Sequence, residues 1–257
     1  SDRSRIDSGC DITEIFEPMD ARTFLHDFVY KGRPAVFRNQ APLEHRSLFT
    51  KDRFQERYGR RTVRIESVPY AGSFGLPGMG ALTLGAVADL AHDASLSQGQ
   101  AYSFSIADPA IRRDAPPPDW LSQVLRVNDL SGGEGSVEHQ FYLGPAGSGA
   151  PVHFHGHAIN CLSYGQKRWL LYPPSQAFYS KSPAQEWFTH EQNTSQHEST
   201  SHPVDPTRQK EVRPALRCDQ NAGDVMYVPA LWGHGTLNLL QSIGTAYEFS
   251  IEPFCME

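Results

Sequence analysis

The sequence lacks the features of several protein classes. No run of about 18 apolar residues occurs in its 257 residues, so no membrane-spanning helix is predicted. The four cysteines lie far apart and form no Cys-x-x-Cys pair, which excludes a structural zinc finger. Lys and Arg number 23 against 29 Asp and Glu, and the net charge of −6 argues against nucleic-acid binding through the bulk surface. We therefore expect neither a transmembrane protein nor a nucleic-acid-binding protein.

The composition favours β structure. Gly (21), Pro (19) and aromatic residues (11%) are abundant and Met (4) is scarce, which is more typical of short strands joined by turns than of a helical bundle. From residue 138 onward, short apolar or alternating segments predict closely spaced strands. The expected strands are 138–143, 151–155, 158–164, 167–172, 213–218, 224–229, 234–240 and 243–251. Their spacing predicts an antiparallel barrel or sandwich.

The first 137 residues have a different pattern, in which helices alternate with a few strands. Helices are expected from Asp20 to about residue 30 and at 50–58, 84–94 and 118–127, and strands at 35–37, 62–66 and 100–106. This region is too rich in glycine and proline to form a separate core. We therefore predict one domain over residues 1–257, with 1–137 supporting a β core at 138–257. The polar segment 180–212 is expected to be an exposed insertion in that core.

Three histidines are candidates for a metal site. His153 and His155 are two residues apart, so on a strand their side chains share a face. His234 follows a turn, a short strand and a proline, in Gly223–His234. Imidazoles from two strands suit Fe, Zn, Cu or Ni. A histidine pair alone is common on exposed strands, but the distal histidine favours a metal site. We expect Gly156 to bend the chain and to leave His157 outside that site.

These motifs resemble the JmjC family of double-stranded β-helix, or cupin-type, oxygenases. The resemblance is close over residues 146–174 and 217–239 and looser before 138. It implies a jelly-roll barrel with flanking helices and a site for Fe(II) and 2-oxoglutarate. The usual triad of that family is His, then Asp or Glu two residues later, then a distal His. Those positions are His153, His155 and His234 here, so an imidazole replaces the carboxylate, and zinc or no metal becomes an alternative.

Lys167 matches the lysine with which related JmjC hydroxylases bind 2-oxoglutarate. A buried ammonium requires an anionic partner, so an inward Lys167 would imply a carboxylate ligand. The alternative is that Lys167 points outward and Arg168 inward, or that both lie on the surface. Two positions depart from the family pattern. A small hydroxyl residue is replaced by Ala150, and a polar residue of the last strand falls near Glu248, where a carboxylate in the pocket would repel 2-oxoglutarate.

The resemblance leads to three functional hypotheses. The first is a 2-oxoglutarate-dependent oxygenase that hydroxylates a protein side chain. The second is a catalytically weak or inactive JmjC fold that acts as a binding or assembly subunit, with or without a bound metal. The third is a cupin dioxygenase with a three-histidine iron centre and no 2-oxoglutarate. We expect a protein substrate or a protein partner in the first two cases.

The resemblance also implies a location in the endoplasmic reticulum lumen or outside the cell. Two features agree with it: the sequence begins at Ser1, as expected if a targeting peptide has been removed, and Asn193 opens an Asn-Thr-Ser glycosylation sequon. In an oxidising compartment not all four cysteines should stay free. Cys10 and Cys218 both lie in segments that resemble the family, so we favour a disulfide between them. Cys161 is expected to be a small buried apolar residue.

Overall fold

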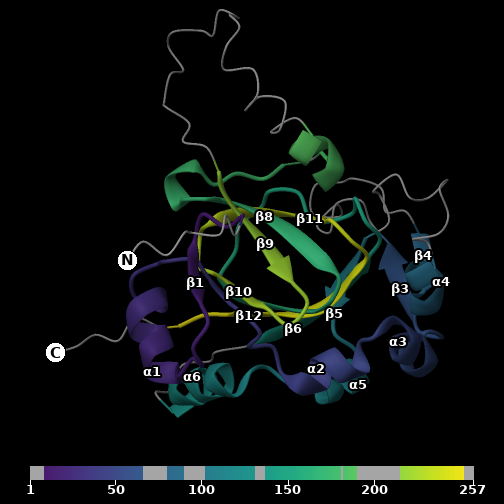
Figure 1. Cartoon of the computed structure of the whole chain (residues 1–257), viewed down its shortest axis with the longest axis horizontal. Helices are drawn as coiled ribbons and strands as arrows, with labels where there is room; N and C mark the ends of the chain where they lie inside the picture. Colours follow the sequence, from purple (N-terminus) through teal and green to yellow (C-terminus); the bar gives the residue numbers. More distant parts are fainter. Residues whose placement is uncertain are drawn as a thin grey trace, which may run out of the picture.

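The strands form two sheets that face each other, with a separate strand pair at one side (Figure 1). This computed structural model describes residues 9–65, 80–89, 102–130 (126–130 as backbone only), 137–180, 182–189 and 215–251. The larger sheet has the order β1-β2-β10-β7-β12-β6-β5 and the smaller one β11-β8-β9. The strands are β1 (Thr13–Ile15), β2 (Ala35–Phe37), β3 (Thr62–Ile65), β4 (Gly80–Thr83), β5 (Ser103–Ile106), β6 (Glu138–Gly144), β7 (His157–Tyr164), β8 (Gln166–Tyr172), β9 (Leu216–Asn221), β10 (Val225–Val228), β11 (Gly233–Asn238) and β12 (Ser242–Phe249).

From β7 onward the chain passes repeatedly between the two sheets. β7, β10 and β12 belong to the larger sheet, whereas β8, β9 and β11 form the smaller one, and their pairings are antiparallel. The parallel pairing of β1 with β2 makes the larger sheet mixed. In the described residues the strand ladders leave the two sheets separate, so no closed barrel is formed. The predicted class, mostly β with flanking helices and a jelly-roll arrangement, is confirmed.

Alternation along the strands divides the core into two layers. Phe37 and Tyr227 point to the outer side of the larger sheet, where they pack with Phe24 and Trp120 from the helices. Their strand neighbours Val36 and Met226 point into the space between the two sheets. There they pack with Trp169 of β8 and Cys218 of β9. Because successive side chains of a strand point to opposite faces, one sheet serves both layers.

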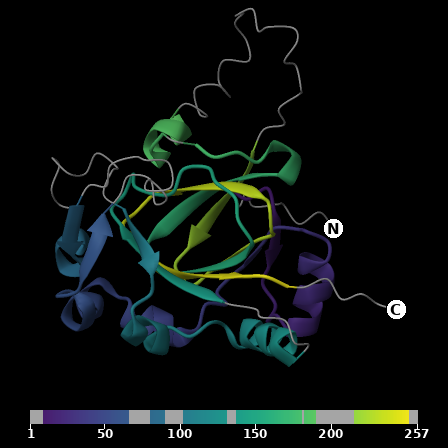
Figure 2. The same cartoon turned by 180° about the vertical axis from the view of Figure 1, so that it is seen from behind.

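The helices are α1 (Ala21–Phe24), continued by the π-helical turn η1 (Leu25–Val29), α2 (Leu43–Leu48), α3 (Lys51–Tyr58), α4 (Leu84–Asp89), α5 (Pro109–Asp114) and α6 (Asp119–Leu130), and the 3₁₀ turn η4 (Pro174–Gln176). Of these, α1, α2, α5 and α6 lie along the outer face of the larger sheet, and α3 and α4 lie at its side next to β3 and β4, as Figures 1 and 2 show from opposite sides. The first helix begins after Asp20, whose carboxylate accepts hydrogen bonds from the N–H groups of Arg22 and Thr23 at 3.0 Å each. None of the helices in the described residues is long and apolar enough to cross a membrane.

Two expectations from the sequence are wrong in part. Residues 151–155 form no strand: the chain bends at Val152, the segment has a single β-bridge, between His153 and His234, and Pro151 has no N–H to donate. The insertion at 180–212 is not wholly exposed. Its residues 184–189 are helical, and Ala184 and Phe188 are buried because they lie on one face of that helical turn. Residue 181 and residues 190–212 of the insertion, including Asn193, lie outside the described residues.

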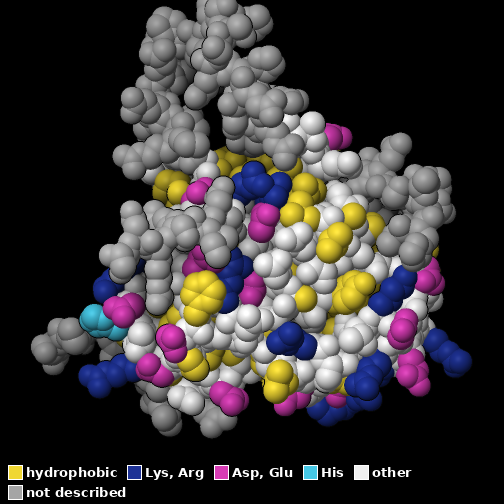
Figure 3. Space-filling view, in the orientation of Figure 1, with side chains coloured by type: hydrophobic (Ala, Val, Ile, Leu, Met, Phe, Trp, Pro, Cys, Tyr) yellow, Lys and Arg dark blue, Asp and Glu magenta, His cyan; other side chains and the backbone are white. Residues whose placement is uncertain are grey.

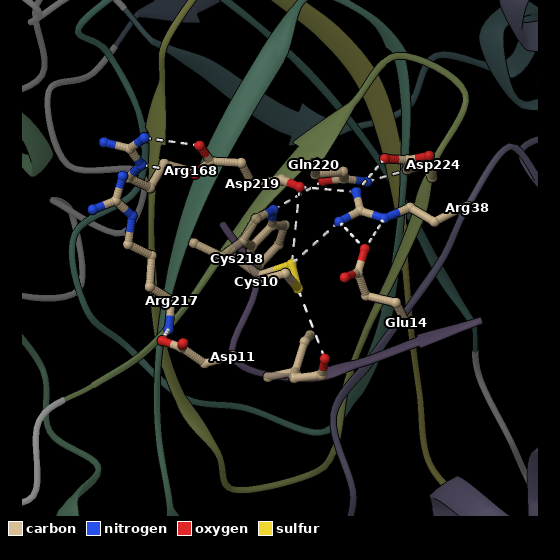
Figure 4. The surroundings of a disulfide bond; sticks show 12 residues. Cys10, Asp11, Glu14, Arg38, Arg168, Arg217, Cys218, Asp219, Gln220 and Asp224 are labelled. Carbon is tan, nitrogen blue, oxygen red and sulfur yellow. Dashed lines mark hydrogen bonds and ion pairs between the residues drawn. A yellow bond between two sulfur atoms is a disulfide. The ribbon is translucent and has the colours of Figure 1, made fainter. Parts of the chain in front are cut away.

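A disulfide between Cys10 and Cys218 attaches the N-terminal segment to β9 (Figure 4). Next to it, the guanidinium of Arg38 contacts the carboxylates of Glu14 at 2.7 Å and Asp224 at 2.6 Å. These groups are largely buried, so the ion pairs are screened less than surface pairs. The disulfide and the ion pairs together hold β1 and β2 against the start of β10. Elsewhere on this face, Figure 3 shows Lys and Arg side chains interspersed with Asp and Glu.

Candidate metal and dicarboxylate site

The three candidate histidines lie together between the sheets. His153 and His155 come from the extended segment before β7, and His234 lies in β11 directly opposite His153. The backbones of His153 and His234 exchange two hydrogen bonds, of 3.0 and 2.8 Å, which fix this register. One ring nitrogen from each of the three histidines lies within 4.8 Å of the other two. We call these residues the histidine trio.

The second ring nitrogen of each histidine faces a hydrogen-bond acceptor. Nδ1 of His153 lies 2.8 Å from the carbonyl oxygen of Pro151, and Nδ1 of His234 lies 3.0 Å from that of Trp232. Nδ1 of His155 lies 3.1 Å from the carbonyl oxygen of Gly156. A carbonyl can only accept, so in neutral imidazoles the proton sits on Nδ1 and the lone pair on Nε2. The backbone thus sets the tautomer that coordinates a metal through Nε2.

Burial keeps two members of the trio neutral. Desolvation, reinforced by the neighbouring His155, lowers the pKa of His153 to about 3. Desolvation and the other two imidazoles also lower the pKa of His234 well below its usual value. Neutral imidazole is the form that binds a metal. Three imidazole nitrogens on one side of a small space, two of them held neutral by burial, fit a divalent ion such as Fe(II) or Zn(II), so the residues present fit the metal that a JmjC site requires.

His157 lies outside the trio, as expected. Its Nδ1 is 2.9 Å from the hydroxyl of Tyr227 and accepts a hydrogen bond from the N–H of Ala230 at 3.2 Å. These contacts hold the ring against β10 and the corner that follows it. His157 therefore supports the chain next to the trio without contributing a nitrogen to it.

Lys167 lies on the inner face of β8 and is fully buried. It shares that face with Trp169, two residues along, while Arg168 points away and pairs with Asp219 at 2.7 Å. The alternative with Lys167 outward and Arg168 inward is therefore wrong. The ammonium of Lys167 lies 3.3 Å from the hydroxyl of Tyr102 and 4.2 Å from the centre of the Tyr142 ring. Burial lowers the pKa of Lys167 to about 7.

One small cavity joins Lys167 to the trio. It has a volume of about 40 Å³, and its walls include all three histidines, Lys167, Tyr102, Asn160, Thr236 and Ala246. A buried ammonium beside metal-binding nitrogens suits a ligand that carries a carboxylate at one end and metal-binding oxygens at the other. The residues present therefore also fit 2-oxoglutarate chemically.

The two departures from the family pattern are placed differently from the expectation. Glu248 does not line this cavity. Its Oε1 accepts a hydrogen bond from the N–H of Gly156 at 3.3 Å and lies 3.5 Å from Nδ1 of His155, on the side away from Nε2. The expected repulsion of 2-oxoglutarate by Glu248 inside the pocket is therefore wrong. Near Ala150, the hydroxyl of Thr236 accepts a hydrogen bond from the Ala150 N–H at 3.1 Å and supplies the cavity with a hydroxyl.

The sequence arguments missed the tyrosines around Lys167. Tyr142 donates a hydrogen bond to the side chain of Asn160 at 2.8 Å, and burial raises the pKa of both Tyr102 and Tyr142. Of the cavity residues that the sequence arguments missed, Thr236 could have been found. It is two residues from His234, so strand alternation puts both side chains on the same face of β11. Tyr102 comes from a strand far along the chain, and no local pattern places it beside Lys167.

The chain resembles known proteins over most of its length. The cupin-like domain family matches residues 21–247. JmjC domain-containing protein 8 from Homo sapiens is 30% identical over 208 residues, which cover 77% of this chain and 68% of that protein. Its namesake from Mus musculus is 35% identical over 107 residues, or 41% of this chain and 35% of that protein. The 2-oxoglutarate and iron-dependent oxygenase JMJD4 from Gallus gallus is 30% identical over 132 residues, or 49% of this chain and 28% of that protein.

Several of these relatives are matched over only a part of their length. The match spans about a third of the mouse protein and just over two thirds of the human one. The family match extends from α1 to β12 and includes the histidine trio and Lys167. With its mostly β fold of facing sheets and its match to JmjC proteins over 77% of its length, this chain belongs to the JmjC family of cupin-like proteins.

Proposed function

We propose that this chain is an Fe(II)- and 2-oxoglutarate-dependent oxygenase that hydroxylates a side chain of a protein substrate. The observation that carries the proposal is the shared cavity, in which three imidazoles and the ammonium of Lys167 meet. The similarity to a 2-oxoglutarate and iron-dependent oxygenase supports the cofactors. A protein substrate is supported by the name of another relative, the arginine-specific demethylase JMJ22 of Arabidopsis thaliana, 32% identical over 111 residues.

The residues of the cavity have distinct roles in this proposal. His153, His155 and His234 would hold the iron through Nε2. Lys167 would bind the far carboxylate of 2-oxoglutarate, which supplies the anion that a buried ammonium needs. The Tyr142 ring, whose centre lies 4.2 Å from that ammonium, would help to enclose it. When bound, iron and 2-oxoglutarate supply the oxidising chemistry, while the protein orients and encloses them.

The small volume of the cavity means that 2-oxoglutarate cannot bind without a change in its walls. At about 40 Å³ it holds only a few water molecules and is too small for a five-carbon dicarboxylate. Binding therefore requires side chains of the wall to move. Tyr102 is the candidate for this movement, because its hydroxyl contacts Lys167 where the carboxylate would bind.

Anaerobic titration of the Fe(II)-loaded protein with 2-oxoglutarate tests the proposal. A metal-to-ligand charge-transfer band should develop in the wild type. Lys167→Met should bind iron but show no band at the same concentrations. Arg168→Met removes the same charge from the outer face of β8 and should keep the band. Iron binding without a band in the wild type would contradict the proposal.

The second candidate is a JmjC fold without oxygenase activity that acts as a binding or assembly subunit. It is favoured by the replacement of the carboxylate ligand by His155 and by the small volume of the cavity. In that case the trio holds zinc, another divalent ion or no metal. Stoichiometric metal binding with no response to 2-oxoglutarate would support this candidate over the oxygenase.

We also propose that the chain resides in the endoplasmic reticulum lumen or is secreted. The Cys10–Cys218 disulfide supports this location, since disulfides persist in oxidising compartments. Asn193 would then carry a glycan. Treatment of the protein from its native source with an N-glycosidase should lower its mass, and Asn193→Gln should abolish that change. A cytosolic protein with free Cys10 would contradict the proposal.

A further inference from the structure

The histidine trio presents a metal with no negative charge. Its three donors are neutral imidazoles, whereas the usual JmjC triad includes one carboxylate. A carboxylate nevertheless lies directly behind one of the three. Oε1 of Glu248 is 3.5 Å from Nδ1 of His155, the nitrogen that faces away from the metal position.

The local structure directs Glu248 to this place. Glu248 lies in β12 opposite Ala158 of β7, next to the segment that carries His155. The N–H of Gly156 donates to Oε1 of Glu248 at 3.3 Å. A β-carbon at position 156 would lie 3.2 Å from the backbone oxygen of Phe249, which is a tight contact, and 3.6 Å from Oε1 of Glu248, so a glycine leaves room for the two segments at this point. The side chains of Glu248 and His155 are about three quarters buried, with exposed fractions of 27% and 23%.

A hydrogen bond or close contact from the Nδ1–H of a metal-bound imidazole to a carboxylate changes the properties of that imidazole. An acceptor at Nδ1 fixes the ring and increases the electron density on Nε2, and an anionic acceptor does so more strongly than a carbonyl. His153 and His234 have backbone carbonyls in this position. Nδ1 of His155 has the carbonyl of Gly156 in this position at 3.1 Å and, beside it, the carboxylate of Glu248 at an ion-pair distance of 3.5 Å. It also stands where the family has its carboxylate.

We propose that Glu248 is a positioning residue of the metal centre, which supplies through His155 the negative charge that the family provides with a direct carboxylate ligand. The charge is moved outward by the width of one imidazole ring. This inference rests on the metal centre of the proposed function and adds a residue that the trio requires for tight binding.

Metal affinity measures the effect without any need for activity. Isothermal titration of the metal-free protein with Zn(II) should show that Glu248→Gln binds about 10–100-fold more weakly than the wild type. Glutamine keeps the acceptor for the Gly156 N–H, so this change removes the charge alone. The control is Glu138→Gln: Glu138 is the strand partner of Glu248 in β6 and is exposed, and its replacement should leave the affinity close to that of the wild type.

Two further measurements separate the proposed role from a structural one. In the Co(II)-substituted protein, Glu248→Gln should shift the visible absorption bands, whereas Glu138→Gln should not. In a His155→Asp background the metal has a direct carboxylate ligand, so adding Glu248→Gln should cost no affinity.

The outcomes are distinguishable. Equal Zn(II) affinities and Co(II) spectra of wild type and Glu248→Gln would overturn the role of Glu248 and leave the metal centre intact. An equal loss of Zn(II) affinity in Glu248→Gln and Glu138→Gln would overturn it as well, because the loss would then come from removing any nearby negative charge and not from the contact with His155. A wild-type protein that takes up no divalent ion would overturn the metal centre and this inference together.

Discussion

Replacing Lys167 with methionine should stabilise the ligand-free protein while removing its binding of a dicarboxylate. Burial lowers the pKa of Lys167 from 10.5 to about 7. Because 1.36 kcal/mol corresponds to a pKa difference of one, placing the charged amine in the fold costs on the order of 5 kcal/mol, and about 4 kcal/mol of this opposes folding at pH 7. The contact of the ammonium with the Tyr142 ring offsets up to about 2 kcal/mol.

Methionine fills a similar volume without a charge, so we expect Lys167→Met to raise the free energy of unfolding by about 2–3 kcal/mol at pH 7. The effect should depend on pH in a defined direction. Since the pKa is lower in the folded state, the unfolded chain binds more protons between pH 7 and 10.5. Wild-type stability should therefore rise with pH in this window, and the advantage of methionine should shrink by about 2 kcal/mol between pH 7 and pH 9.

Urea unfolding of metal-free and ligand-free protein, followed by tryptophan fluorescence at pH 7 and pH 9, measures this directly. Lys31→Met is the control, because Lys31 is exposed and pairs with Asp27 one helical turn away. Its effect should stay within about 0.5 kcal/mol at both pH values. A Lys167→Met protein that is less stable than the wild type at pH 7, with an unchanged urea dependence, would refute the reasoning.

Three other predictions concern the trio, the disulfide and His45, a buried histidine of α2. His234→Ala should abolish stoichiometric metal uptake measured by titration, while His157→Asn should bind metal like the wild type; the reverse result would mean that the trio is assigned wrongly. Cys10→Ser opens a disulfide that spans 208 residues and should lower the free energy of unfolding in urea by up to about 5 kcal/mol; an unchanged value would show that the bond adds nothing to stability. Burial lowers the pKa of His45 to about 4, so the wild type should lose about 3 kcal/mol of stability as the pH falls from 6.5 to 4. His45→Gln should remove that part of the acid sensitivity, and an identical pH profile of the two proteins would contradict the prediction.

Local patterns predicted the second half of the fold well. Strands β6 to β12 lie within a few residues of the expected segments because alternation and turn glycines mark them. The bend expected at Gly156 likewise separated His157 from His153 and His155. These features depend on neighbours within a few residues, and such neighbours are visible in a sequence.

Features that depend on distant partners could not be predicted. β1 and β2 have three residues each and pair with each other, and β2 also pairs with β10, which lies nearly 200 residues later in the chain. The predicted strand at 151–155 failed because only His153 finds a bridge partner. Glu248 was expected in the pocket because the family has a polar pocket residue near that position, but a position in a strand does not give the direction in which a long side chain turns. Gly156, whose N–H attracts that side chain, decides it.

The disulfide between Cys10 and Cys218 also sets an order of events during synthesis. Its first cysteine leaves the ribosome long before its partner, and Cys161 emerges between them. In an oxidising compartment, a nascent chain can therefore pair Cys10 with Cys161 before Cys218 exists. Only the later formation of β7 buries the Cys161 thiol and withdraws it from exchange. Correct pairing thus has to wait for most of the chain, and folding of this protein should depend on a disulfide isomerase more than its single described bond suggests.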